Sequence, residues 1–169
     1  MKVTIPEELK KNAPDSKWGK ILTVTPVVMT VVATLLAGLA SSEMTTAQYD
    51  RALGAQLQSK AGDQWGYFQA KKLRGAMLKN SLEVRYDVEA KLNQAIANMY
   101  ELQVRKANIS AERHHKRSGQ FFFGMLAAQA AVIIATLAMA AQRRSLLWSV
   151  AAAAGLAAIL FAVYVYLRV

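Results

Sequence analysis

Residues 21–40, ILTVTPVVMTVVATLLAGLA, decide how this chain folds, because they contain no Asp, Glu, Lys, Arg or His. Residues 121–141, FFFGMLAAQAAVIIATLAMAA, and residues 146–167, LLWSVAAAAGLAAILFAVYVYL, share this property. An α-helix needs about 20 apolar residues to cross roughly 30 Å of hydrocarbon. Each stretch is apolar on every side, which is typical of a helix surrounded by lipid. The sequence therefore predicts three transmembrane helices, over residues 21–40, 120–141 and 146–167.

The composition separates charge from hydrophobicity along the chain. Of the 169 residues 54% are hydrophobic, yet the formal net charge is +10. Nearly all charged residues lie between or beside the apolar stretches, and a chain of this length offers no large core that could bury those stretches away from water. The chain has no cysteine, so disulfides, a thiol nucleophile and a cysteine-ligated metal are excluded.

Basic residues near the spans predict the orientation in the membrane. They cluster ahead of the first span, whereas residues 41–50 after it contain no Lys or Arg. Cytoplasmic flanks carry an excess of Lys and Arg, so residues 1–20 are expected to form a cytoplasmic N-terminal segment. The short basic loop of residues 142–145 then lies on the same side, although the basic run of residues 113–117 favours the opposite orientation. The N-terminal basic residues are Lys2, Lys10, Lys11, Lys17 and Lys20.

Residues 41–119 must leave the membrane and return to the same side, so we expect an antiparallel helical hairpin outside it. Charges of both signs alternate with good helix formers here, and there is no proline. Each arm can continue into its span without a break, and the turn is expected near residues 79–82, with residues 61–63 as a rival. One apolar series follows the spacing of a coiled-coil seam and is interrupted only by Lys106. The predicted seam is Val88, Leu92, Ala95, Met99, Leu102 and Ile109.

Four sequence blocks resemble a known family. They are Ser41-Ser42-Glu43-Met44, then Asp63-Gln64-Trp65-Gly66-Tyr67-Phe68-Gln69-Ala70-Lys71, then His114-His115-Lys116-Arg117, and Arg143-Arg144 followed by Trp148. From about residue 18 onward the chain resembles the bacterial membrane-protein family catalogued as domain of unknown function 4337. The resemblance implies one N-terminal span, a coiled-coil-like middle, two C-terminal spans and no known activity. The expected fold is thus an all-α, multi-pass protein of the bacterial inner membrane with a periplasmic hairpin.

Residues with catalytic or metal-binding chemistry are few. His114 and His115 are the only histidines, and adjacent helical positions point about 100° apart, so they cannot both bind one ion within a single chain. In an oligomer, a ring of either histidine could hold a metal or haem. Glu83 and Asp87 have the spacing of a carboxylate pair, which is more often a solvated helix face. We therefore expect no catalytic, cofactor-binding or metal-binding residues, and no enzyme.

The remaining features favour contact between proteins. Trp65, Tyr67 and Phe68 form an aromatic cluster in a polar arm, where such rings commonly anchor neighbouring subunits or partners. Small residues recur every fourth position in the spans, and Gln129 can bond across helices. We expect a membrane-anchored oligomeric scaffold, or an accessory subunit of a larger membrane complex, that contacts membrane lipids and no nucleic acid. The alternative is a homo-oligomeric channel lined by Thr23, Thr30 and Thr34.

Overall fold

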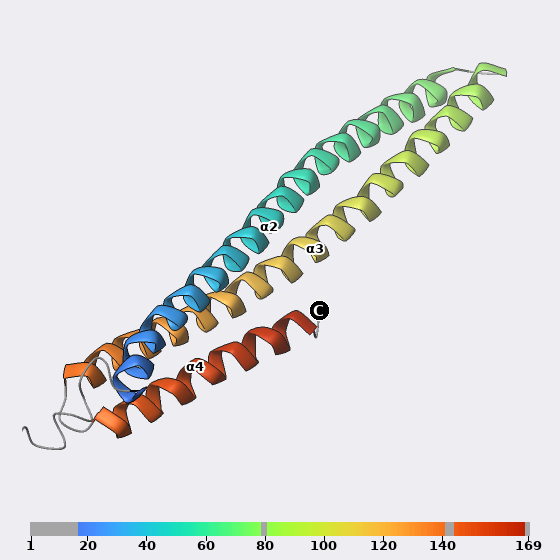
Figure 1. Cartoon of the computed structure of the whole chain (residues 1–169). Coiled ribbons are helices and arrows are strands. Elements are labelled where there is room, and N and C mark those ends of the chain that lie inside the picture. Colours follow the sequence, from blue (N-terminus) through green and yellow to red (C-terminus); the bar gives the residue numbers. More distant parts are fainter. Residues whose placement is uncertain (1–16, 79–80, 141–143, 168–169) are drawn as a thin grey trace, which may run out of the picture. The chain divides into compact units, whose positions relative to one another are not determined.

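The computed structural model describes residues 17–78, 81–140 and 144–167, and these residues are helical apart from Leu78. The described helices are α2 over Lys17–Met77, α3 over Ser81–Ala140 and α4 over Arg144–Leu167 (Figure 1). With 61 and 60 residues, α2 and α3 each join a predicted span to a predicted hairpin arm without interruption. α4 begins inside the predicted loop of residues 142–145, whereas residues 1–16 and 141–143 lie outside the described residues.

Each of the three helices contains a segment long and apolar enough to cross a membrane. Only 22%, 33% and 17% of the residues in these apolar segments of α2, α3 and α4 are buried inside the protein. Most of their apolar side chains are therefore exposed, whereas a soluble helix exposes mainly polar ones. The prediction of an all-α chain with three membrane-length apolar helices is confirmed.

The helices divide into two compact units, and the first comprises the described residues of Met1–Ser42 and Arg117–Val169. Trp148 Nε1 of α4 donates a hydrogen bond to Thr25 Oγ1 of α2 at 3.0 Å, near the start of both helices. Farther along, Leu36 of α2 and Phe161 of α4 both lie against Gly124 of α3. Within this unit α2 and α4 thus run in the same direction and both contact α3. The core cluster is Ala33, Leu36, Ala40, Phe121, Ala128, Ala158 and Val165.

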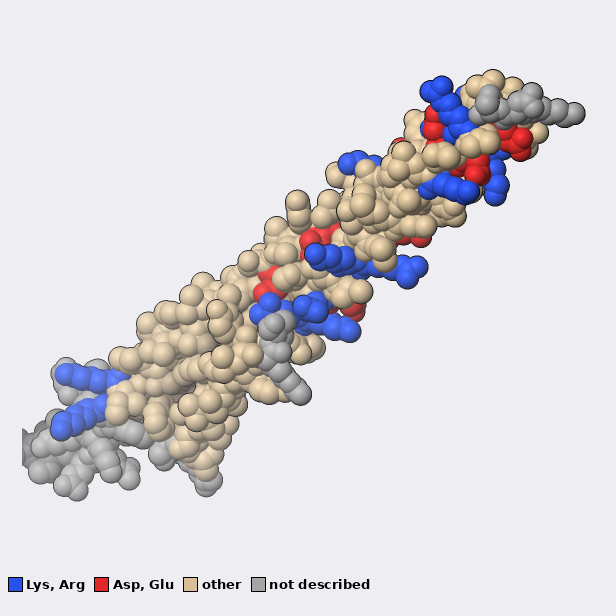
Figure 2. All heavy atoms as spheres, turned by 90° about the vertical axis from the view of Figure 1, so that its right-hand side faces the viewer, with Lys and Arg blue, Asp and Glu red and all other residues tan. Residues whose placement is uncertain are grey.

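The second unit, Glu43–Lys116, consists of the remaining parts of α2 and α3 packed side by side. Contacts pair late residues of one helix with early residues of the other, which makes the two helices antiparallel. Lys71 Nζ lies 3.1 Å from Glu89 Oε2, and Trp65 Nε1 lies 2.8 Å from Glu101 Oε1. Figure 2 shows basic and acidic side chains interspersed over this unit, whereas uncharged residues cover most of the first.

Small residues build the contact between α2 and α3 in the second unit. Ala47, Gly54 and Ala61 recur at intervals of seven on α2 and are buried. A Cβ added to Gly54 would lie 3.0 Å from Asn108 Oδ1, and one added to Gly75 would lie 3.3 Å from Tyr86 Cβ, so the helices approach closely at both glycines. The matching residues of α3 are Ala90, Ala97, Ala107 and Ala111, each at most 7% exposed.

The predicted hairpin seam is wrong in one respect, because its residues face away from α2. Val88, Leu92, Met99, Leu102 and Ile109 are 49–66% exposed, and Ala95 is exposed as well. The exposed series follows alternating steps of four and three residues, and the buried Ala90 and Ala97 lie seven residues apart, which is two helical turns on the same helix. This periodicity establishes a helix but does not tell which face meets the partner helix. The seam is predicted from the larger side chains, whereas alanines form the contact between α2 and α3.

In the second unit α2 ends at Met77 and α3 begins at Ser81. Leu78 N donates a hydrogen bond to Gly75 O at 3.2 Å, which closes the last turn of α2. The turn was expected near residues 79–82, of which residues 79–80 lie outside the described residues while Ser81 begins α3. The rival turn at residues 61–63 lies inside α2.

Candidate interaction surfaces

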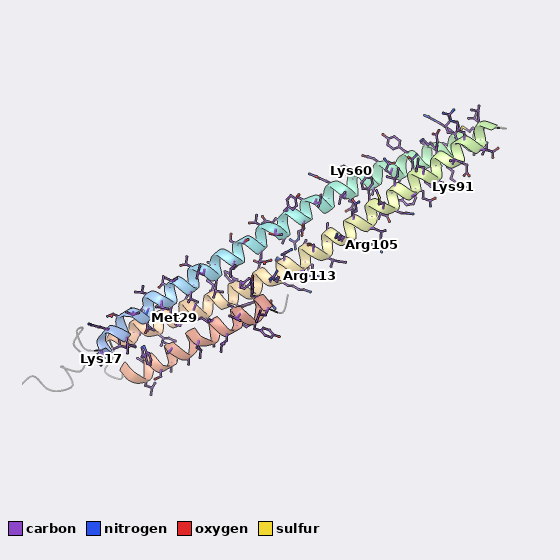
Figure 3. All side chains as sticks on the ribbon, turned by 45° about the vertical axis from the view of Figure 1, so that its right-hand side comes forward. Lys17, Met29, Lys60, Lys91, Arg105 and Arg113 are labelled. Atoms are coloured by element: carbon purple, nitrogen blue, oxygen red, sulfur yellow. The ribbon has the colours of Figure 1, made fainter. Side chains whose placement is uncertain are left out.

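One face of α3 in the second unit carries a row of exposed apolar residues, the α3 stripe, defined as Val88, Leu92, Ala95, Met99, Leu102 and Ile109. The stripe covers 21 residues of rise, about 31 Å at 1.5 Å per residue. Its residues follow alternate steps of four and three, with Lys106 at one of these positions, so they form a ridge on one side of the helix that is interrupted only by Lys106. Figure 3 labels Lys91 and Arg105, two exposed basic residues of α3 within the length of the stripe. A row of exposed apolar side chains is typical of a surface that another helix covers.

The aromatic cluster is divided between the inside and the outside of the second unit. Trp65 Nε1 donates a hydrogen bond to Glu101 Oε1 at 2.8 Å, and the Trp65 and Phe68 rings meet edge to face at 5.5 Å. Lys72 Nζ lies 5.4 Å from the centre of the Phe68 ring. Tyr67 is 58% exposed. Trp65 and Phe68 thus make contacts within the chain, and Tyr67 is the ring best placed to contact another molecule.

Replacing Trp65 by Phe is expected to lower the free energy of unfolding by about 1 kcal/mol, because a half-buried hydrogen bond to a carboxylate is lost while a large ring remains. Thermal unfolding of the purified full chain measures this change. Tyr67→Phe is the matched control, since it removes a hydroxyl from an exposed ring and should leave stability unchanged. Equal stability of Trp65→Phe and the unmodified chain would show that the Glu101 contact contributes nothing.

Polar side-chain contacts connect the two helices of the second unit at both ends. His114 Nδ1 lies 2.5 Å from Glu43 Oε2, and both side chains are largely buried. At the other end Lys71 bonds to Glu89, which also accepts from Arg85 Nε at 3.3 Å. The hydrogen bond and charge of Lys71, with a smaller effect of Arg85, lower the pKa of Glu89. The contacts of Glu89 therefore stabilise the unit above the usual pKa of glutamate and are lost as pH falls through its lowered pKa.

Two polar atoms of the second unit are buried without a hydrogen-bond partner among the described residues. They are Asp50 Oδ2 on α2 and Asn93 Nδ2 on α3. An unsatisfied buried polar group costs about 1–3 kcal/mol.

The residues considered for catalysis or metal binding do not converge. His114 contacts Glu43 of its own chain, and His115 is exposed. Asp87 pairs with Lys91 at 2.7 Å, and Glu83 is exposed on the same helix. Among the described residues no group of three His, Asp or Glu side chains could hold a metal ion. The four residues His114, His115, Glu83 and Asp87 thus do not form one common site.

The first unit carries one polar hollow within its apolar surface, between α2 and α3. Thr30, Thr34 and Gln129 line it together with apolar neighbours. Thr30 Oγ1 donates to Pro26 O at 2.8 Å, and Thr34 Oγ1 donates to Thr30 O at 2.9 Å. Both hydroxyls, like that of Thr23, thus bond back to their own helix. The exposed amide of Gln129 is left as the polar group of this hollow that can bond to another molecule.

Comparison with known proteins identifies a family but no function. Residues 18–168 match the model of the family described as Domain of unknown function (DUF4337). No curated protein and no solved structure matches the chain. The match includes both compact units and confirms the resemblance carried by the blocks around Trp65 and His114.

Proposed function

The chain belongs to the DUF4337 family, and from its surfaces we propose that it is a non-enzymatic, membrane-anchored helical scaffold whose copies associate through the α3 stripe. The observation that carries this proposal is the exposure of the whole stripe in a single chain. A ridge of this length with five large apolar side chains is unfavourable in water. Because its residues have the spacing of a coiled coil, a second helix can cover it.

The apolar segments of α2, α3 and α4 anchor this scaffold by spanning the membrane. Their exposed side chains are mostly apolar, so hydrocarbon is the solvent in which such a surface is stable. Lys17 and Lys20 stand at the first turn of α2 and mark the cytoplasmic end, as the positive-inside rule favours. The second unit then lies on the periplasmic side of the bacterial inner membrane as an antiparallel coiled-coil hairpin.

A second copy is the expected occupant of the stripe. Copies inserted in one membrane share one topology, so their α3 helices run in the same direction and equal residues of the stripe meet. Lys106 is exposed at a stripe position, and a single lysine at such a position lowers stability while fixing register and number of strands. The exposed Gln129 amide supports the same assembly, because an amide in hydrocarbon favours a bond to a neighbouring helix.

Cysteine cross-linking tests this assembly in a chain that has no cysteine of its own. Ile109→Cys is expected to form a disulfide-linked dimer on mild oxidation in native membranes, because equal residues of two parallel stripes lie opposite each other. Asn108→Cys is the matched control, since position 108 is exposed but turned by about 100° on the same helix. It should remain monomeric under the same conditions.

Other outcomes of the cross-linking experiment contradict the proposal in distinct ways. A disulfide between Ile109→Cys and Leu92→Cys chains, without one between two Ile109→Cys chains, indicates an antiparallel pair and overturns the shared orientation. Linkage of Ile109→Cys to a different protein alone assigns the stripe to a partner and makes the chain an accessory subunit.

A further inference from the structure

The first unit has an open apolar groove between α2 and α4 that its own side chains do not fill. The groove has a volume of about 450 Å³. Val24 and Val28 of α2 form one wall, and Ala152 and Leu156 of α4 form the other. Among the residues that the structure describes, no acidic side chain lines it. A groove with walls from two helices offers a ligand contact on two sides, whereas the exposed face of one helix offers contact on one.

The length of the groove corresponds to one leaflet of a bilayer. Its lining residues on α2 extend from Lys20 to Met29, and those on α4 from Trp148 to Ile159. These intervals of nine and eleven residues correspond to about 14 and 16 Å of helix. The hydrocarbon core of a bilayer is about 30 Å thick, so one leaflet contributes about 15 Å. A single acyl chain of one leaflet therefore has the length of this groove.

The inner end of the groove is formed where Met29 packs against Gly155. A Cβ on residue 155 would collide with the side chain of Met29. Glycine at this position thus lets the methionine lie across the contact between α2 and α4. Figure 3 labels Met29 and Lys17, which lie near the two ends of the α2 wall.

The opposite end of the groove is basic and rigid. Lys20 lines the groove there, and Lys17 is exposed one turn earlier on α2. The Trp148 ring is fixed by its hydrogen bond to Thr25 Oγ1, which in turn donates to Ile21 O at 2.7 Å. Tryptophan and lysine are the side chains that commonly meet lipid headgroups at the edge of the hydrocarbon.

We propose that this groove binds one acyl chain of an anionic phospholipid, with the lipid phosphate against Lys20. The apolar walls cover the chain along one leaflet, and the ammonium group of Lys20 compensates the negative headgroup. The inference rests on the proposed function only in that the apolar segments span a membrane. It does not need the copies to associate.

Native mass spectrometry of the purified full chain in detergent tests this site with two added lipids, phosphatidylglycerol and phosphatidylcholine of identical acyl chains. The fraction of chains that carry one phosphatidylglycerol is expected to be about fivefold larger than the fraction that carry one phosphatidylcholine. This ratio corresponds to the attraction of one basic residue to an anionic group. Lys20→Gln should reduce this ratio to about one. Ala152→Trp should remove both lipids, because the indole fills the groove.

Ala157→Trp is the matched control, since Ala157 is exposed on α4 but does not line the groove. It should bind phosphatidylglycerol as the unmodified chain does. Equal retention of the two lipids by the unmodified chain would overturn the site. An undiminished preference of Lys20→Gln for phosphatidylglycerol would overturn it as well. Neither result depends on whether Ala152→Trp folds. If the unmodified chain shows no preference between the two lipids while Ile109→Cys still forms its disulfide-linked dimer, the lipid site is overturned and the proposed scaffold function is retained.

Discussion

Chains in which Met99 and Leu102 are both replaced by Glu are expected to lose self-association while keeping their fold. Both side chains are at least 49% exposed in the single chain, so the substitutions do not disturb the contact between α2 and α3. In a pair of chains, however, the stripe is buried, and an unpaired buried charge costs about 3–5 kcal/mol. The dissociation constant should therefore rise at least about a hundredfold. Native mass and sedimentation in one detergent measure this change.

A matched double substitution separates the stripe from a general effect of charge. Ala52→Glu with Ala55→Glu adds the same charges at the same spacing on α2, where both positions are exposed. This control should associate as the unmodified chain does. If the control and the stripe variant dissociate equally, net charge rather than the stripe governs assembly. If neither dissociates, the chains meet at another surface.

The second large effect is expected at Ala97, which is 0% exposed in the contact between α2 and α3. Leucine at this position adds three carbon atoms where the helices already approach closely. Overpacking of this kind costs about 1–3 kcal/mol, so Ala97→Leu should unfold the second unit at a clearly lower temperature. Circular dichroism during thermal unfolding measures the loss.

Ala95→Leu provides the control for Ala97→Leu on the same turn of α3. Ala95 is exposed within the stripe, and the helix propensities of Ala and Leu are similar. Its stability should be unchanged, while its self-association should increase because the ridge gains apolar surface. Equal destabilisation by the two leucines would mean that helix propensity, and not the close contact of α2 and α3, limits stability.

In the sequence, only the spacing of the small residues indicates that the stripe faces away from α2. Ala33, Ala40, Ala47, Gly54 and Ala61 recur at intervals of seven along α2. Such a series favours close approach of two helices, yet each member contributes little hydrophobic area and attracts less notice than leucine or methionine. The small residues and the stripe residues both repeat every seven positions, so the period alone does not tell which face of a helix packs against the neighbouring helix.

The aromatic cluster shows the same limit at the level of single residues. The sequence indicates that Trp65, Tyr67 and Phe68 cannot all face the same way, because neighbouring helical positions diverge by about 100°. It does not indicate which ring turns inward. The position of Glu101, 36 residues later in the chain, decides that Trp65 does.

The sequence by itself determined the helical class of this chain and the positions of its three membrane-length segments, because charge and hydrophobicity are local properties that helix length converts directly into structure. The structure alone decided which faces pack, because packing depends on the register between residues far apart, such as Gly54 with Asn108 and Trp148 with Thr25. The exposed stripe on α3 and the groove beside Trp148 both follow from those registers.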